Sequence, residues 1–92
     1  MLYVRRVVGE SMRPTLLPGK VVVAIKMPLR EGMIVIAEVQ SHEVIKRLIR
    51  ITPEGCWLEG DNKAASTDSR VYGFVPRQDV KAVVITRSTK TA

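Results

Sequence analysis

The chain is organised around one loop framed by glycines and prolines, GESMRPTLLPG at residues 9–19. Pro14 and Pro18 fix their own φ angles and favour extended conformations in the residues before them. The loop therefore holds its serine, Ser11, in a fixed place. Ser11 is either a nucleophile, which needs a base from elsewhere in the chain, or the cap of a short turn.

The composition indicates one small globular domain. The chain has 92 residues, 46% of them hydrophobic, and a formal net charge of +6, which suits a modest core. We expect this domain to cover residues 1–86 and residues 87–92 to form a disordered tail. The basic balance permits an anionic partner, but aromatic residues are only 4% of the chain. We therefore expect no nucleic-acid partner.

No apolar run comes near the length needed to cross a membrane, about 20 residues. The run at residues 21–25 is bounded by Lys20 and Lys26. We expect no transmembrane segment and a cytoplasmic protein, while membrane association through a longer parent or a partner stays open. The lone Cys56 excludes an internal disulfide, and with His42 as the one histidine the chain cannot build a closed Cys/His zinc site.

Short β-branched runs separated by turn residues predict a compact all-β domain of mostly antiparallel strands. The expected strands are residues 2–8, 20–26, 33–39, 42–51, 56–59 and 80–86. The second is apolar almost throughout, which predicts burial on both faces. The fourth also fits helical spacing, but the tight turn expected at residues 40–41 favours a β-hairpin.

Two residues could serve as a base for Ser11. His42 lies at the expected hairpin end, where a solvated role is more common than a catalytic one. Lys46 works only if its amine loses solvent, since a usual pKa of about 10.4 leaves almost none neutral at pH 7. On a strand, Lys46 shares its face with Val44 and Leu48, and this apolar frame would lower its pKa. The alternative is a lysine that snorkels from a sheet edge.

Residues 60–70 form a long polar segment with two acidic side chains. Asp61 could pair with Arg47 if that arginine is buried. Asp68 and Arg70 are two residues apart, so on an extended segment they share a face and could pair. The segment is either an ordered internal network or a solvated loop.

Three blocks of the sequence resemble type I signal peptidases, the Ser/Lys-dependent S26 family of serine peptidases. The blocks are Ser11-Met12-x-Pro14-Thr15-Leu16, then Ile45-Lys46-Arg47, then Gly60-Asp61-Asn62 followed by Ser66-x-Asp68-Ser69-Arg70. The LexA-like self-cleaving repressors share the fold and the Ser–Lys pair, but the Pro14-Thr15 and Asp68-Ser69-Arg70 elements look like a signal peptidase. The resemblance implies the coiled antiparallel sheets of the signal peptidase/LexA-like fold, and a site without metal or cofactor.

The resemblance also implies a role for each matching residue. Ser11 would be the nucleophile, with its backbone N–H as one oxyanion donor, and Lys46 the general base. Ser66 would orient the lysine through a hydrogen bond. Some family members supply a second oxyanion donor from a serine two residues before the nucleophile. That position is Gly9 here, so a backbone amide or water would have to serve.

Five further residues would support this site. They are Met12, whose backbone lines the substrate pocket, Asp61 paired with Arg47, and Asp68 paired with Arg70. The resemblance thus predicts a serine endopeptidase that removes a signal peptide or propeptide from a precursor polypeptide through an acyl-enzyme.

The span of residues 48–59 leaves no room for the insertion that many bacterial signal peptidases carry before the Gly-Asp-Asn block. The small chain resembles the nickel superoxide dismutase maturation peptidases instead. Two other functions stay open. One is a catalytically silent peptidase fold that binds a partner, and the other is a nucleic-acid-binding domain, suggested by the basic stretch at residues 46–50.

Overall fold

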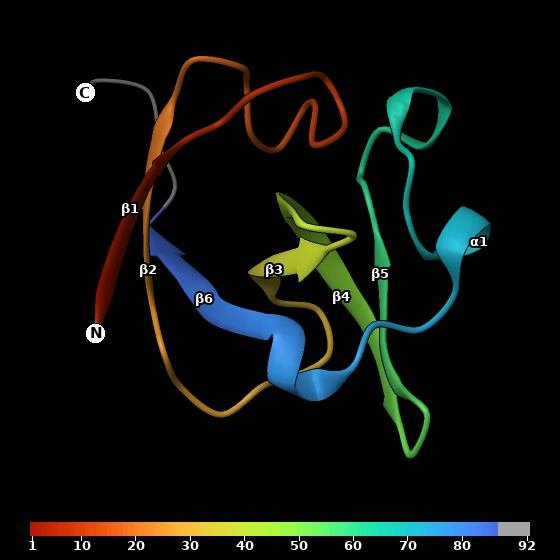
Figure 1. The fold of residues 1–92 in the computed structure, drawn as a ribbon. Coiled ribbons are helices and arrows are strands. Elements are labelled where there is room, and N and C mark those ends of the chain that lie inside the picture. The colour runs from red at the N-terminus through yellow and green to blue at the C-terminus, as the bar shows by residue number, and fades with distance from the viewer. Residues whose placement is uncertain (87–92) are drawn as a thin grey trace.

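The computed structural model describes residues 1–86, in which six antiparallel strands form one coiled sheet (Figure 1). The strands are β1 (Leu2–Arg6), β2 (Val21–Ile25), β3 (Ile34–Val39), β4 (His42–Thr52), β5 (Gly55–Glu59) and β6 (Val80–Thr86). Their order in the sheet is β1-β2-β6-β3-β4-β5. The predicted all-β fold is confirmed. The tail predicted at residues 87–92 lies outside the described residues.

The β3–β4 hairpin confirms the strand predicted at residues 42–51 and excludes the helical alternative. Val39 pairs with His42 across the turn, and the two residues between them, Gln40 and Ser41, have φ angles of 52° and 68°. Positive φ at both central residues is typical of the tight turns whose twist matches that of the flanking strands.

The burial predicted for the second strand was wrong. Val22 and Ala24 are fully buried, but Val21 is 43% exposed, so β2 alternates as a strand with one face on the core. Its neighbours in the sheet are β1 and β6, and only its inner face meets the hydrophobic core. β-Branched residues on the outer face therefore contribute strand propensity rather than core volume.

The polar segment at residues 60–70 contains more regular structure than a loop. It holds a 3-10 turn, η1 (Lys63–Ala65), and the start of a short helix, α1 (Ser69–Tyr72); a second 3-10 turn, η2 (Arg77–Asp79), precedes β6. Asp68 caps α1, because its side chain accepts a hydrogen bond from the Arg70 N–H. The segment is ordered by its own polar side chains.

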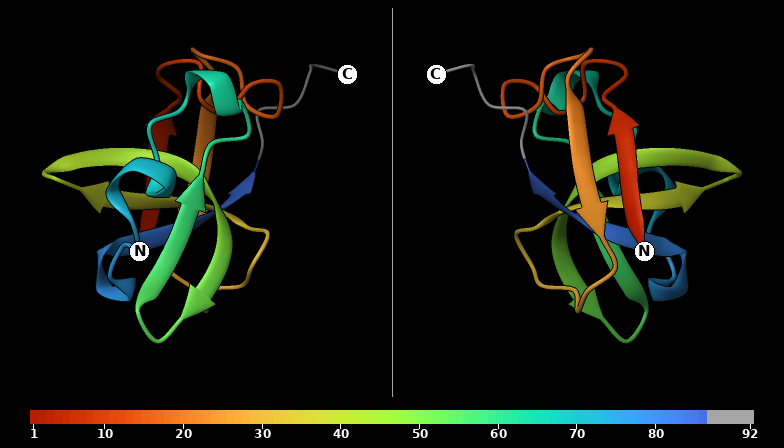
Figure 2. Two further views of the ribbon diagram at one scale, coloured as in Figure 1. Left: turned by 90° about the vertical axis from the view of Figure 1, so that its right-hand side faces the viewer. Right: turned by 90° about the vertical axis from the view of Figure 1, so that its left-hand side faces the viewer.

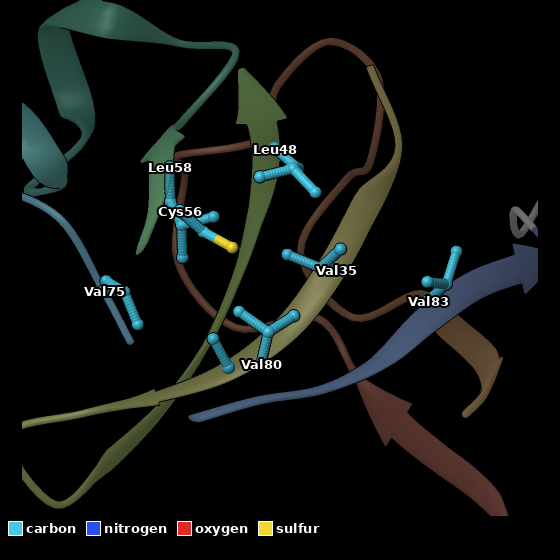
Figure 3. Packing of buried hydrophobic residues seen from close by; sticks show 8 residues of the cluster. Val35, Leu48, Cys56, Leu58, Val75, Val80 and Val83 are labelled. Atoms are coloured by element: carbon cyan, nitrogen blue, oxygen red, sulfur yellow. The ribbon is translucent and has the colours of Figure 1, made fainter. Parts of the chain in front are cut away.

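The core has two parts, one on each side of the central strands. The larger part is shown in Figure 3 and lies among β3, β4, β5 and β6; it includes Val35, Leu48, Cys56, Leu58, Val75, Val80 and Val83. The smaller part lies under β1 and β2. It receives Met12 and Leu16 from the loop at residues 9–19, which we call the Ser11 loop.

The Ser11 loop and the segment around η1 lie at the same end of the molecule, although they are far apart in the sequence (Figure 2). A hydrogen bond from the Asn62 N–H to the Ser11 carbonyl, 2.8 Å long, joins them. No helix within residues 1–86 is long and apolar enough to span a membrane.

Candidate active site

Hydrogen bonds at its neck and two buried side chains hold the Ser11 loop. The Gly19 N–H donates to the Val7 carbonyl at 2.8 Å, which closes the neck. Met12 is 1% exposed and Leu16 2%; they lie one turn apart, and the Leu16 N–H donates to the Met12 carbonyl at 2.8 Å. Ser11 itself is partly exposed. Within residues 1–86 its hydroxyl makes no hydrogen bond, so it does not act as a cap.

Lys46 lies on β4 with its stem against the larger part of the core. Its cross-strand partner is Val35, its same-face neighbour Leu48 is fully buried, and Lys46 itself is only 6% exposed. Its Nζ donates a hydrogen bond to Ser66 Oγ at 3.1 Å. Burial lowers the pKa of Lys46 below its usual value, although the Asp68 carboxylate opposes this shift. This is the apolar frame that the sequence predicts.

Asp68 anchors Ser66 from behind. The carboxylate is fully buried and accepts hydrogen bonds from Ser66 Oγ at 2.7 Å, from the Gly60 N–H at 2.8 Å and from Arg70 Nε at 2.9 Å. Burial alone would raise the pKa of Asp68, but these donors outweigh it and hold the pKa well below its usual value. The predicted Asp68–Arg70 pair is present; Asp68 has an extended backbone and caps α1, while Arg70 lies in the first turn of that helix.

Asp61 forms a second cluster that ties three segments together. Its carboxylate accepts hydrogen bonds from Arg47 Nη2 on β4 at 2.6 Å and from Thr15 Oγ1 in the Ser11 loop at 2.5 Å. Burial raises the pKa of Asp61, but these two partners lower it more. The predicted Asp61–Arg47 pair is therefore present. It also fixes the Ser11 loop through Thr15, a contact that the sequence analysis missed.

Gly60 lies against both the Ser11 backbone and the Ser66 hydroxyl that binds Lys46. A Cβ atom on Gly60 would lie 2.3 Å from Ser66 Oγ and 2.6 Å from the Ser11 carbonyl oxygen. The Ser11 backbone is thus next to the hydroxyl that binds Lys46, and the Asn62 N–H holds it there. Within residues 1–86 no hydrogen bond joins the Ser11 hydroxyl to the Lys46 ammonium.

The remaining predicted residues take less direct places. Gly9 is exposed with a φ of +82°, and no atom lies within 4 Å of where its Cβ would be. The backbone N–H of Ser11 makes no hydrogen bond in the described part of the chain. His42 is exposed at the start of β4, which matches the solvated role expected of it.

A groove of about 290 Å³ runs between β1 and the first half of β4. Its lining residues are Arg5, Arg6, Val7, Val8, Met12, Glu43, Val44 and Ile45. β1 is the outermost strand at one end of the sheet, and β5 pairs with β4 only from Arg47 onward. Among the described residues, both strands therefore have an unpaired backbone edge on this side. Proteins commonly bind an extended peptide at such an edge, where the peptide adds as a further strand.

The sequence matches the family described as Peptidase S24-like over residues 1–83. The chain belongs to the Peptidase S24-like family. It is therefore a protein of serine-peptidase fold, and its coiled antiparallel sheet is consistent with that family. A search of curated proteins found no match. Within residues 1–86 of this Peptidase S24-like chain, no three His, Cys, Asp or Glu side chains gather where they could hold a metal ion.

The contacts of Gly60 lead to a prediction for this Peptidase S24-like fold. In Gly60→Ala the new methyl group would overlap the Ser11 carbonyl, which is backbone and cannot move aside without shifting the loop. We expect a loss of about 2–3 kcal/mol in the free energy of unfolding, measured by urea denaturation.

Gly32→Ala is the matched control. Gly32 has a φ of +94° but open space around its Cβ position, so this change adds only backbone strain, about 1 kcal/mol. A Gly60→Ala protein as stable as the Gly32→Ala protein would contradict the close approach described above.

Proposed function

We propose that the chain is a serine endopeptidase in which Ser11 is the nucleophile and Lys46 the general base. One observation carries the proposal: a buried lysine amine is held by Ser66, and Ser66 is held by the fully buried Asp68, directly beside the Ser11 backbone. A lysine whose amine stays in water does not require buried hydrogen-bonding partners of this kind. A lysine whose pKa is shifted by burial and by specific charged neighbours is typical of a catalytic base.

The hydrogen bonds to Lys46 leave its lone pair free for Ser11. Ser66 donates its own proton to Asp68 and accepts one from Lys46, so the neutral amine keeps its lone pair for another partner. Lys46 would take the Ser11 proton as Oγ bonds to the peptide carbonyl carbon. The two side chains make no hydrogen bond in the free protein, but such contacts often tighten only when substrate binds.

The tetrahedral oxyanion would accept a hydrogen bond from the Ser11 N–H, which has no other partner within residues 1–86; a donor of this kind is worth about 3 kcal/mol in the transition state. The peptide C–N bond then breaks, and Lys46 gives its proton to the leaving amine. This leaves an ester on Ser11. Water attacks the ester carbonyl while Lys46 takes its proton, the ester C–O bond breaks, and Lys46 returns the proton to Ser11 Oγ.

The proposed substrate is a precursor polypeptide that lies as an added strand in the groove between β1 and β4. Within the family we place the chain nearest the type I signal peptidase-like (S26) proteins, on the resemblance of its three blocks. Residues 48–59, which carry a large insertion in many bacterial signal peptidases, here form only part of the β4–β5 hairpin. This favours the small subgroup similar to nickel superoxide dismutase maturation peptidases, with propeptide removal from a cytoplasmic precursor as the reaction.

A mixture of random decapeptides tests the proposal. Wild-type protein should cleave a subset of them, detected as new termini by mass spectrometry, and Ser11→Ala should cleave none. Rapid acid quenching should also trap an acyl group on the peptide that contains Ser11. Cleavage that persists in Ser11→Ala would refute the mechanism. Peptide binding without any cleavage by wild type would favour a catalytically silent binding module instead.

The pH dependence of cleavage gives a further prediction. kcat/KM should rise with pH through the pKa of Lys46, which burial places below the usual 10.5. The positive charge of Arg70 contributes to this lowering, so Arg70→Gln should raise the pKa of Lys46 and move the rising limb to higher pH. Arg77→Gln removes an equal charge from an exposed position of η2 and should leave the limb in place. A limb that does not respond to Arg70→Gln would identify another group as the base.

A further inference from the structure

The two ends of the groove between β1 and β4 differ in chemistry. At one end its lining is apolar and includes Val7, Met12, which follows Ser11 in the chain, and Ile45, which precedes Lys46. Two residues earlier on each strand, and therefore on the same face, lie Arg5 and Glu43. Their side chains meet across the groove, with Arg5 Nε 2.5 Å from Glu43 Oε1. A peptide strand in the groove would place alternate side chains over the apolar end and over this ion pair.

The ion pair is asymmetric in its other partners. Glu43 has a second cation, since Lys81 Nζ on β6 lies 3.3 Å from its Oε2. Within residues 1–86 Arg5 has no second carboxylate; its guanidinium lies 5.5 Å from the centre of the Tyr3 ring. If Arg5 turned to a substrate carboxylate, Glu43 would keep Lys81. If Glu43 turned to a substrate ammonium, Arg5 would be left without an anion.

Arg6, the second basic residue of the groove, is less able than Arg5 to turn to a substrate. Arg6 Nη1 donates to the Gly19 carbonyl at 2.9 Å, which ties its guanidinium to the neck of the Ser11 loop. Arg5 is thus the cation that can be exchanged. Arg5 and Glu43 are partly exposed, with side-chain exposures of 38% and 28%, so an incoming peptide can reach both.

We propose that Arg5 selects an acidic side chain in the substrate, at the second residue before the one whose carbonyl Ser11 attacks. This inference rests on the proposed peptidase function. The N-terminal part of the substrate is assigned to the groove because it stays attached to Ser11 as the acyl group, whereas the C-terminal part leaves after the first half of the reaction. β1 and β4 both run toward the Ser11 and Lys46 end, so the bound strand lies parallel to them.

A glutamate scan tests the inference in the cleavage reaction. The probes are acetylated decapeptides of alanine and serine with one Glu moved along the chain, and matched sets with Lys or Gln in its place. Wild-type protein should cleave the peptide bond that follows the second residue after the Glu, so that the cleaved bond moves as the Glu is moved. The Glu peptides should be cleaved about five- to tenfold faster than the Lys peptides, the range expected for a partly exposed ion pair.

Variants of the ion pair should change this ratio in opposite directions. Arg5→Gln should reduce the Glu-to-Lys ratio to about one. Glu43→Gln should increase it, because it removes the carboxylate that competes with the substrate for Arg5. Arg77→Gln lowers the net charge equally but lies outside the groove, so the ratio should stay at the wild-type value. A cleaved bond that ignores the Glu, or a ratio that Arg5→Gln leaves unchanged, would overturn the inference.

A binding assay separates this inference from the proposed function. Fluorescence anisotropy with Ser11→Ala measures the affinity for the same peptides without cleavage. Tighter binding of Glu peptides that is lost in Arg5→Gln/Ser11→Ala would support the inference even if wild type cleaved nothing, which would refute the peptidase function alone. Cleavage by wild type with equal binding of Glu and Lys peptides would refute the inference alone.

Discussion

Lys46→Met should lower the turnover of cleaved peptides by about 1,000-fold or more, the usual effect of removing the base that activates a serine. Methionine has an unbranched stem of similar length, so it can fill the space between Val35 on β3 and Leu48 on β4. Lys46 is only 6% exposed, and the cost of burying its amine disappears with the substitution. We therefore expect a folded protein that is inactive and at least as stable as wild type at neutral pH.

The measurement is kcat on the best decapeptide, with circular dichroism as the check of folding. Lys26→Met, at an exposed position, is the control and should keep wild-type turnover. Lys46→Arg should be as inactive as Lys46→Met, because a guanidinium does not give up its proton in proteins. Wild-type turnover by the Lys46→Met protein would end the proposed mechanism.

Lys46→Met should also change how the free energy of unfolding depends on pH, which can be measured without any substrate. Burial lowers the pKa of Lys46 in the folded state, so between that lowered pKa and the usual 10.5 the unfolded chain binds more protons than the folded one. The free energy of unfolding should gain a positive slope with pH across this window. Lys46→Met should lack this contribution, and urea denaturation at a series of pH values measures the difference.

Asp68→Asn should have the largest effect on stability, a loss of about 2–4 kcal/mol. Asp68 is fully buried and receives donors on both oxygens, from Gly60, Ser66 and Arg70. The amide group of asparagine keeps one acceptor and directs two hydrogens at groups that are themselves donors. Ser66 then loses its anchor, so turnover should fall as well. The acid limb of the pH profile should move to lower pH, because the Asp68 charge raises the pKa of Lys46.

The stability difference between wild type and Asp68→Asn should itself depend on pH. The folded-state pKa of Asp68 lies below the usual 3.8, so its contribution is fully present above that usual value and declines as pH falls through the lowered one. Asp79 is a partly buried acidic residue of η2. Asp79→Asn is the control and should lower the free energy of unfolding far less. Equal losses for the two variants at pH 7 would mean that the network around Asp68 adds nothing to stability.

Local patterns in the sequence predict most of the strands and the surroundings of Lys46. β-Branched runs and turn residues act over a few positions, which is why the β3–β4 hairpin and its turn could be predicted. The neighbours of Lys46 follow from the alternation of a single strand. The exposed outer face of β2 could not be predicted, because that face depends on which other strands lie beside it and on what covers them.

The contacts that assemble the candidate site had no local signal. Gly60 is required by a backbone from another part of the chain, Thr15 by a carboxylate on a distant segment, and Asn62 by the carbonyl of Ser11. Such close approaches appear only once the segments are placed in space. Their nearest trace in the sequence is the Gly-Asp-Asn block itself, where the resemblance implies a role for Asp61 but none for Gly60 or Asn62.

Residues 60–68 contact both the Ser11 loop and Lys46, and this determines at which stage of folding the candidate site is assembled. Within residues 1–86 no hydrogen bond joins the Ser11 and Lys46 side chains; Asn62 holds the Ser11 carbonyl and Ser66 holds the Lys46 amine. These are long-range contacts, which form late because the loop between them must close first. A nascent or partly unfolded chain therefore carries both residues without their relative placement. Hydrolytic capacity of the proposed kind would arrive with the completed fold, which protects unfinished chains and their neighbours from premature cleavage.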